Sequence, residues 1–170
     1  MHYSGSDKRR IINILLLLVV CVLAWLIVQK VQKEQRGPDT LYSDAIGKVM
    51  TRISIQLPHQ PVIMMQAQGA SWQMTAPLSA KVNTQALQQL TTLLYEPIQA
   101  KYPVEGKDLS AFGLGESAIR VQFNDVEYAL GALNPVNHYR YVLHNQQILM
   151  VNEVVYELLS RGVVGFVEEG

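Results

Sequence analysis

An uninterrupted apolar run near the amino terminus constrains this chain more than any other feature. Residues 11–28 read IINILLLLVVCVLAWLIV, and basic residues precede and follow the run. As a helix, a run of this length spans about 27 Å, close to the roughly 30 Å hydrocarbon core of a bilayer. We therefore expect a transmembrane helix over 11–28. The side chains expected to form this membrane anchor are Ile11, Leu15, Leu18, Val22, Trp25 and Val28.

Two other interpretations of the run are open. A cleaved signal peptide has the same basic start and apolar stretch, and Val22-Leu23-Ala24 could serve as its cleavage site. The apolar run, however, continues past that site to Val28. A lipoprotein signal needs a small residue before its cysteine, but Val20 precedes Cys21. The pattern favours a retained anchor.

The flanking segments predict orientation and domain organisation. The short basic tail, residues 1–10, is expected in the cytoplasm, because a long following domain translocates largely regardless of its charge. This predicts a single-pass membrane protein whose domain lies outside the cytoplasm, which in a Gram-negative bacterium means an inner-membrane protein with a periplasmic domain. The polar segment 29–39 ends in Gly-Pro and is expected to be a linker, and 40–170 is long enough for one domain with its own core.

Composition excludes several functional classes. Lys and Arg together number 14 and so do Asp and Glu, and no basic stripe with interleaved aromatic residues occurs, so nucleic-acid binding is not expected. Cys21 is the only cysteine, which rules out an intramolecular disulfide. The richness in Gln suits a surface that contacts other proteins.

Alternating patterns predict a domain of the α+β class, with antiparallel strands in two groups and helices packed on one side. A helix is expected from Asn83 or Thr84 to about Tyr95, and a last one from Asn152 to about Ser160. A short helical turn is expected over 109–112, ended by a glycine. The expected strands are 51–57, 62–65, 71–74, 98–104, 119–123, 128–130, 139–143 and 148–151.

The motifs between these elements resemble a known family. They are a Trp-x-Met-Thr-x-Pro strand exit at 72–77, a Leu-rich helix at 87–94, Phe-Gly-Leu at 112–114, Leu-Gly at 130–131 and Tyr-x-Tyr-Val at 139–142. Over about residues 53–159 the chain looks like a bacterial membrane-anchored domain family of unknown function. Members of that family also occur in tandem in auxiliary subunits of gliding-motility-type ABC transporters. The resemblance implies a membrane-tethered extracytoplasmic module, and it carries over no catalytic residue.

No pattern in the chain predicts a catalytic site, a metal site or a nucleotide-binding loop. His138 and His144 lie at opposite ends of a predicted strand, without carboxylates to complete a metal site. Asp125 and Glu127 fall at a hairpin turn, where acidic residues are ordinary. The serines lack the context of a nucleophile elbow, and Gly113-Leu114-Gly115 lacks that of a nucleotide loop. We expect no catalytic, cofactor or metal residue and no enzyme.

Several residues are candidates for partner contacts. Tyr139, Arg140 and Tyr141 carry the residue types favoured at binding hot spots, although alternating tyrosines also suit one face of a sheet. Asn13 can hydrogen-bond across helices or remain solvated. Phe166 belongs to an apolar tail that could dock on a partner or add to its own sheet.

Three functional hypotheses follow. The leading one is a non-catalytic single-pass accessory or scaffold subunit of a bacterial inner-membrane complex, with integral membrane protein subunits and the bilayer as partners and no small-molecule ligand. The alternative is an extracytoplasmic ligand-binding or auxiliary module of an ABC transport system. That alternative predicts a concave pocket lined by aromatic residues such as Trp72, Tyr139 and Tyr141. A third hypothesis, a hydrolase, would require ionisable residues that converge in a cleft.

Overall fold

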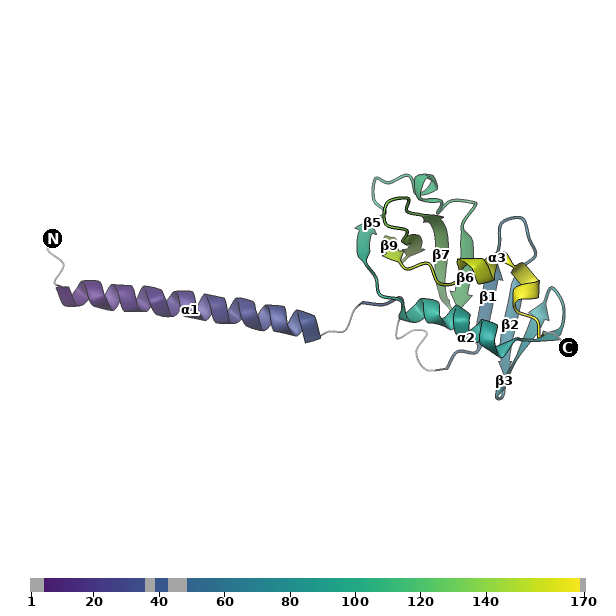
Figure 1. The fold of residues 1–170 in the computed structure, drawn as a ribbon, viewed down its shortest axis with the longest axis horizontal. Coiled ribbons are helices and arrows are strands. Elements are labelled where there is room, and N and C mark those ends of the chain that lie inside the picture. Colours follow the sequence, from purple (N-terminus) through teal and green to yellow (C-terminus); the bar gives the residue numbers. More distant parts are fainter. Residues whose placement is uncertain (1–4, 36–38, 43–48, 169–170) are drawn as a thin grey trace. The chain divides into compact units, whose positions relative to one another are not determined.

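A computed structural model describes the backbone of residues 5–35, 39–42 and 49–168. The chain divides into two compact units, residues 1–39 and 40–170 (Figure 1). Each unit is described by itself.

In the first unit the structure describes one helix, α1 (Gly5–Gln35). Its side chains are described from residue 13 to residue 28, and all of them are exposed. The exposed fractions include 66% for Leu15, 58% for Leu18 and 61% for Trp25. The polar residues 29–35, expected in a linker, continue the helix.

The expected membrane span is contradicted. Within the described part of the chain, no helix has the length and apolarity needed to cross a membrane. The predicted anchor over 11–28, the single-pass topology and the inner-membrane location are therefore wrong. The side chain of Ile11 and the backbone of residues 1–4 and 36–38 lie outside the described residues.

The second unit is built on one antiparallel sheet of nine strands, in the order β4-β3-β2-β1-β6-β7-β8-β9-β5 (Figure 1). The strands are β1 (Arg52–Gln56), β2 (Ile63–Gln68), β3 (Ser71–Ala76), β4 (Ala80–Lys81), β5 (Ala100–Pro103), β6 (Ile119–Phe123), β7 (Val126–Leu133), β8 (Arg140–His144) and β9 (Gln147–Val151).

Among the described residues of this unit, helices are few and short. They are α2 (Thr84–Thr92) and α3 (Tyr156–Ser160), with 3-10 turns η1 (Leu93–Tyr95), η2 (Leu109–Phe112) and η3 (Gly162–Gly165). Asn83 caps α2, because its Oδ1 accepts from the backbone N–H groups of Gln85 and Ala86. The last helix does not start after Asn152 as expected. It starts at Tyr156, whose N–H donates to Oε1 of Glu153 at 3.0 Å.

The α+β prediction with two groups of strands is wrong, because the sheet is continuous and dominates the unit. The two expected groups are joined by the pairing of β1 with β6, in which Ile53 lies opposite Phe123 and Ile55 opposite Val121. These partners are about 70 residues apart in the chain, and local patterns carry no information on such a distant pairing.

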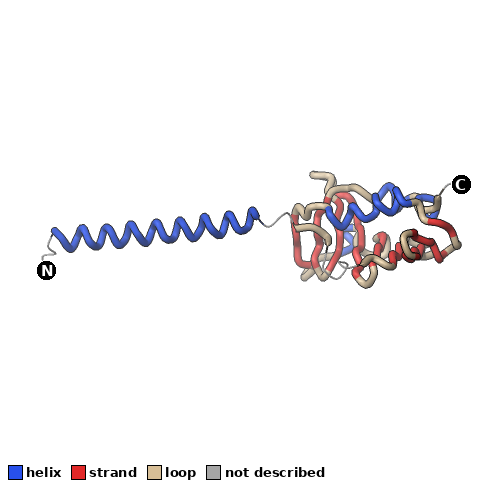
Figure 2. The backbone as a smooth tube through the Cα atoms, turned by 90° about the horizontal axis from the view of Figure 1, so that it is seen from below, coloured by secondary structure: helices blue, strands red, loops and turns tan. Residues whose placement is uncertain are grey.

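One face of the sheet carries the main core. Successive side chains of a strand alternate between faces, so Ile53, Ile55, Val121, Phe123 and Tyr128 all point to this side. Helices α2 and α3 cover the same face (Figures 1 and 2). The residues of α2, η1 and α3, and of the cap before α3, that complete this core are Ala86, Leu90, Leu93, Leu94, Val155, Leu158 and Leu159.

The opposite face of the sheet is polar on β1 and β6, and on its other half it is covered by a later segment of the chain. On β1 and β6 it presents Ser54, Gln56 and Gln122. On β7, β8 and β9 it presents mostly apolar residues instead, and the segment 104–118, which contains η2, packs over β7 and β8. Gly131 of β7 permits that approach, because a Cβ atom there would meet the backbone oxygen of Phe112 at 2.4 Å.

The carboxyl-terminal tail closes one edge of the sheet. Val167 forms an antiparallel bridge with Val82, just beyond β4, and the N–H of Asn83 donates to the oxygen of Phe166 at 2.8 Å. The Phe166 side chain is 0% exposed. Of the two interpretations of this tail, the structure shows the one in which it adds to its own sheet.

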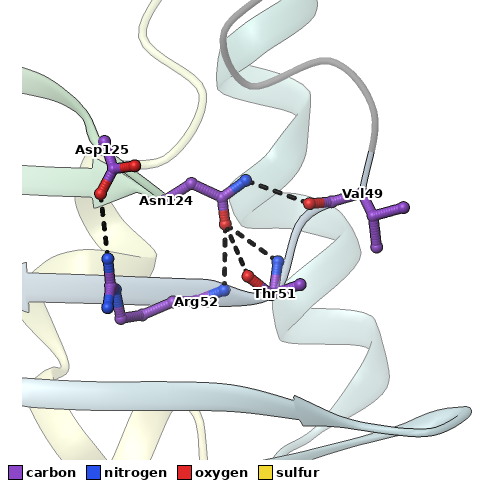
Figure 3. A network of polar contacts seen from close by, with 5 residues as sticks. All are labelled: Val49, Thr51, Arg52, Asn124 and Asp125. Atoms are coloured by element: carbon purple, nitrogen blue, oxygen red, sulfur yellow. Dashed lines mark hydrogen bonds and ion pairs between the residues drawn. The ribbon is translucent and has the colours of Figure 1, made fainter.

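Asn124 ties the amino-terminal end of β1 to the β6–β7 turn (Figure 3). Its Oδ1 accepts from the backbone N–H groups of Thr51 at 2.9 Å and Arg52 at 3.2 Å, and its Nδ2 donates to the oxygen of Val49 at 3.1 Å. Asp125 adds an ion pair with Arg52 at 3.0 Å. The acidic turn therefore has a structural role.

Candidate functional site

The connection between β7 and β8, residues 134–139, leads into the strand that carries three of the five predicted contact residues, Tyr139 at its entry and Arg140 and Tyr141 within it. Asn134 organises the connection, because its Oδ1 accepts from the Val136 N–H at 2.8 Å and its backbone oxygen accepts from the His138 N–H at 2.9 Å. Val136 is left 87% exposed at the tip. Tyr139 is half-buried at the entry to β8.

The sequence predicts Arg140 as a contact residue at the surface, but the structure buries its side chain. Only 7% of the residue is exposed. Its Nε donates to a carboxylate oxygen of Glu153, its Nη1 donates to the backbone oxygen of Gly131, and its guanidinium lies 3.7 Å from the Tyr156 ring centroid. Arg140 also lines a hollow of about 340 Å³. These contacts give it a structural role in joining β7, β8 and the start of α3.

Tyr141 points to the opposite face of β8 and lines a second hollow, which we call the aromatic pocket. This pocket has a volume of about 390 Å³. Its lining residues come from β5, the segment 104–118, the 134–139 connection, β8 and β9, and are Tyr102, Lys107, Phe112, Asn134, Val136, Asn137, Tyr141 and Met150. The ring of Phe112 meets the ring of Tyr141 edge-on, with centroids 5.0 Å apart.

Polar groups in the aromatic pocket are mostly donors. Nδ2 of Asn134 donates to the Tyr141 hydroxyl at 2.7 Å, so that hydroxyl keeps its own proton for another acceptor. Oδ1 of Asn137 accepts from the Tyr139 N–H at 3.2 Å, so the groups of this amide that can bind another partner are its N–H donors. Lys107 Nζ lies 6.0 Å from the Tyr102 ring centroid.

A third and larger hollow, of about 590 Å³, lies between the segment 104–109 and the two hairpin turns at 125–127 and 143–146. Its acidic groups are engaged: Asp125 pairs with Arg52 at 3.0 Å and Glu127 with Arg120 at 2.9 Å. Nδ1 of His144 lies 2.8 Å from the backbone oxygen of Glu127. The described residues contain no cluster of His, Cys, Asp and Glu that could hold a metal ion.

The predicted contact residues are thus only partly brought together. Tyr139, Arg140 and Tyr141 lie at the same end of β8, but on alternating faces. Phe166 is in the core, far along the chain from that end, and Asn13 is exposed on α1. Of the aromatic residues expected in a pocket, Tyr141 lines one, whereas Trp72 is half-buried against the main core.

Sequence reasoning missed Tyr102, Lys107 and Asn137 as members of this site. Asn137 reaches it through the 134–139 connection, and Lys107 through the segment that follows β5. Tyr102 reaches it because β5 pairs with β9, with Tyr102 opposite Ile148 and Ala100 opposite Met150. No local pattern indicates that pairing. The sequence predicts an extended segment over 98–104, but it does not indicate which strand pairs with that segment.

Comparison of the chain with protein-family models, with curated proteins and with solved structures finds no match.

Proposed function

We propose that this protein is a non-catalytic accessory or scaffold subunit of a protein complex, and that α1 is the element that binds its partner. The observation that carries the proposal is the apolar surface of α1. Every described side chain from residue 13 to residue 28 is exposed, and all but Asn13 in this stretch are apolar.

The apolar side chains lie all around α1 rather than on one stripe. A helix that is apolar all round is normally buried, since a single apolar face would suffice for packing on one neighbour. Full burial of one Leu or Ile side chain contributes roughly 1.5–3 kcal/mol. Burial of Leu15, Leu18 and Val22 together would therefore supply a large share of a specific binding energy.

The domain adds a rigid body to this helix. Its core is closed by α2, α3 and the carboxyl-terminal tail, and Leu41 at its start is only 3% exposed. Tyr42 stacks on Tyr95 with ring centroids 5.4 Å apart, which fixes the first residues of the domain. A domain with such a closed core suits the role of bracing the partner that α1 binds. Integral membrane protein subunits as the partners remain a prediction from the sequence.

A second candidate function is a ligand-binding module. The aromatic pocket favours it, because ligand sites combine apolar and aromatic walls with a few convergent polar groups. An auxiliary role beside an ABC transporter also remains a prediction from the sequence.

The first proposal is tested by affinity purification of the full chain in mild detergent, followed by mass spectrometry and stoichiometry. We expect one partner in constant ratio to the chain, and its loss from the double variant Leu18→Asn, Val22→Asn. The matched control is Val164→Asn, which makes the same change at a 78% exposed residue of the domain. Recovery of the chain alone under all conditions, or equal recovery with both variants, would contradict the proposal.

A further inference from the structure

We infer that the aromatic pocket binds a small ligand in which a flat ring carries one anionic group, a carboxylate or a phosphate. The inference rests on the second candidate function and does not depend on α1. Three independent features of the pocket carry it: its apolar floor, its aromatic walls and the sign of its charge.

The floor and walls suit a ring. Met150, which is 4% exposed, closes the bottom of the pocket. Phe112 and Tyr141 form one wall in an edge-on pair, and Tyr102, 42% exposed, forms another. Aromatic rings attract a further ring by offset stacking or edge-to-face contact, in addition to the area that is buried.

The charge of the pocket selects an anion. No acidic residue is among the described residues that line it, and Lys107 supplies its positive charge. Lys107 forms no ion pair with any residue that the structure describes, so its ammonium can receive a new partner. Lys107 lies close enough to the Tyr102 ring for a weak cation–π contact, which holds the ammonium beside the aromatic wall.

Two neutral donors complete the site. The orientation of the Asn134 amide is fixed, because its Oδ1 accepts from the Val136 N–H. Its Nδ2 then occupies an acceptor position of the Tyr141 hydroxyl, and the proton of that hydroxyl is free to donate to a ligand oxygen. The Asn137 amide offers further N–H groups at the same rim. An ammonium with neutral donors matches the acceptor-only oxygens of a carboxylate or phosphate.

The test uses the full chain in mild detergent and ligand-observed NMR with benzoate, phenyl phosphate, benzyl alcohol and acetate as probes. We expect benzoate or phenyl phosphate to bind with a dissociation constant of about 1 mM, as suits so small a ligand. Benzyl alcohol lacks the charge and acetate lacks the ring, so each should bind at least about tenfold more weakly. The tighter of the two anionic probes identifies the anionic group.

Variants assign the binding to this pocket. Lys107→Gln should weaken binding of the anionic probe about fivefold to tenfold, and Tyr141→Phe about threefold. The matched control is Lys101→Gln, which removes the same charge from the opposite face of β5, beyond reach of the pocket. All comparisons are made in one detergent, so partition of the probe into micelles cancels.

The inference is overturned if no probe binds at about 10 mM, if benzyl alcohol binds as tightly as benzoate, or if Lys101→Gln and Lys107→Gln have equal effects. None of these results bears on recovery of a partner through α1. Failure here and failure of the first proposed function are therefore distinguishable.

Discussion

Tyr128 shows how a single residue joins the start of the domain to its sheet. The side chain is 0% exposed and lies in the core between Phe123 and His144. Its hydroxyl donates to the backbone oxygen of Leu41, which is itself buried. The hydrogen bond thus satisfies a carbonyl group that has left water, and it fixes the chain where the domain begins.

Tyr128→Phe should therefore destabilise the protein. The ring is kept, but the buried oxygen of Leu41 loses its donor, and such a loss costs about 1–2 kcal/mol. Chemical denaturation measures the change. The matched control is Tyr95→Phe, because Tyr95 is 63% exposed and should lose less than about 0.5 kcal/mol. Equal effects of the two substitutions would contradict the role of this hydrogen bond.

The same residue predicts a pH dependence. Burial raises the pKa of Tyr128 to about 12, whereas a tyrosine in the unfolded chain titrates near 10. The unfolded chain loses the proton first, so this stabilising contribution is complete below about pH 10 and is lost as the pH rises toward 12. The stability difference between the natural chain and Tyr128→Phe should narrow over that interval. A constant or widening difference would contradict the assignment.

Among the helices and strands, the sequence predicts correctly those elements whose pattern lies within a few neighbouring residues. The expected strand at 119–123 coincides with β6, and Asn83 caps α2 as its position predicts. The short turn at 109–112 ends at Gly113, whose φ of +66° is one that glycine adopts readily. The two-residue strand β4 was missed, because so short a segment leaves no alternation to detect.

Gly131 is the residue that lets the segment 104–118 pack closely on β7. A Cβ atom there would meet the Phe112 oxygen at 2.4 Å and the Leu114 side chain at 2.8 Å. Gly131→Ala should therefore push the segment 104–118 away from β7 and cost about 1–3 kcal/mol. Gly115→Ala is the control, since its nearest contact would be an ordinary 3.8 Å. Thermal unfolding of the two variants should separate them, and equal melting temperatures would be inconsistent with this packing.

At the scale of the whole molecule, the sequence predicts the strands but not their arrangement. The single sheet depends on β1 pairing with β6 and β5 pairing with β9, and both pairs are distant in the chain. The aromatic pocket depends on the second of these, which is why only Tyr141 among its lining residues was expected there. The apolar run at 11–28 correctly indicates a helix, but its expected role as a membrane span is contradicted for the described residues.

The function proposed for the whole molecule depends on α1 binding a partner protein through its apolar side chains. Site-specific photo-cross-linking in intact cells tests it most directly, with the photoreactive residue placed in turn at Leu15, Leu18 and Val22, all exposed on α1, and at Val164 as the control. We expect one cross-linked protein, the same from all three positions on α1 and absent from Val164. Cross-links to lipid alone, or a set of proteins that does not differ between α1 and Val164, would contradict it.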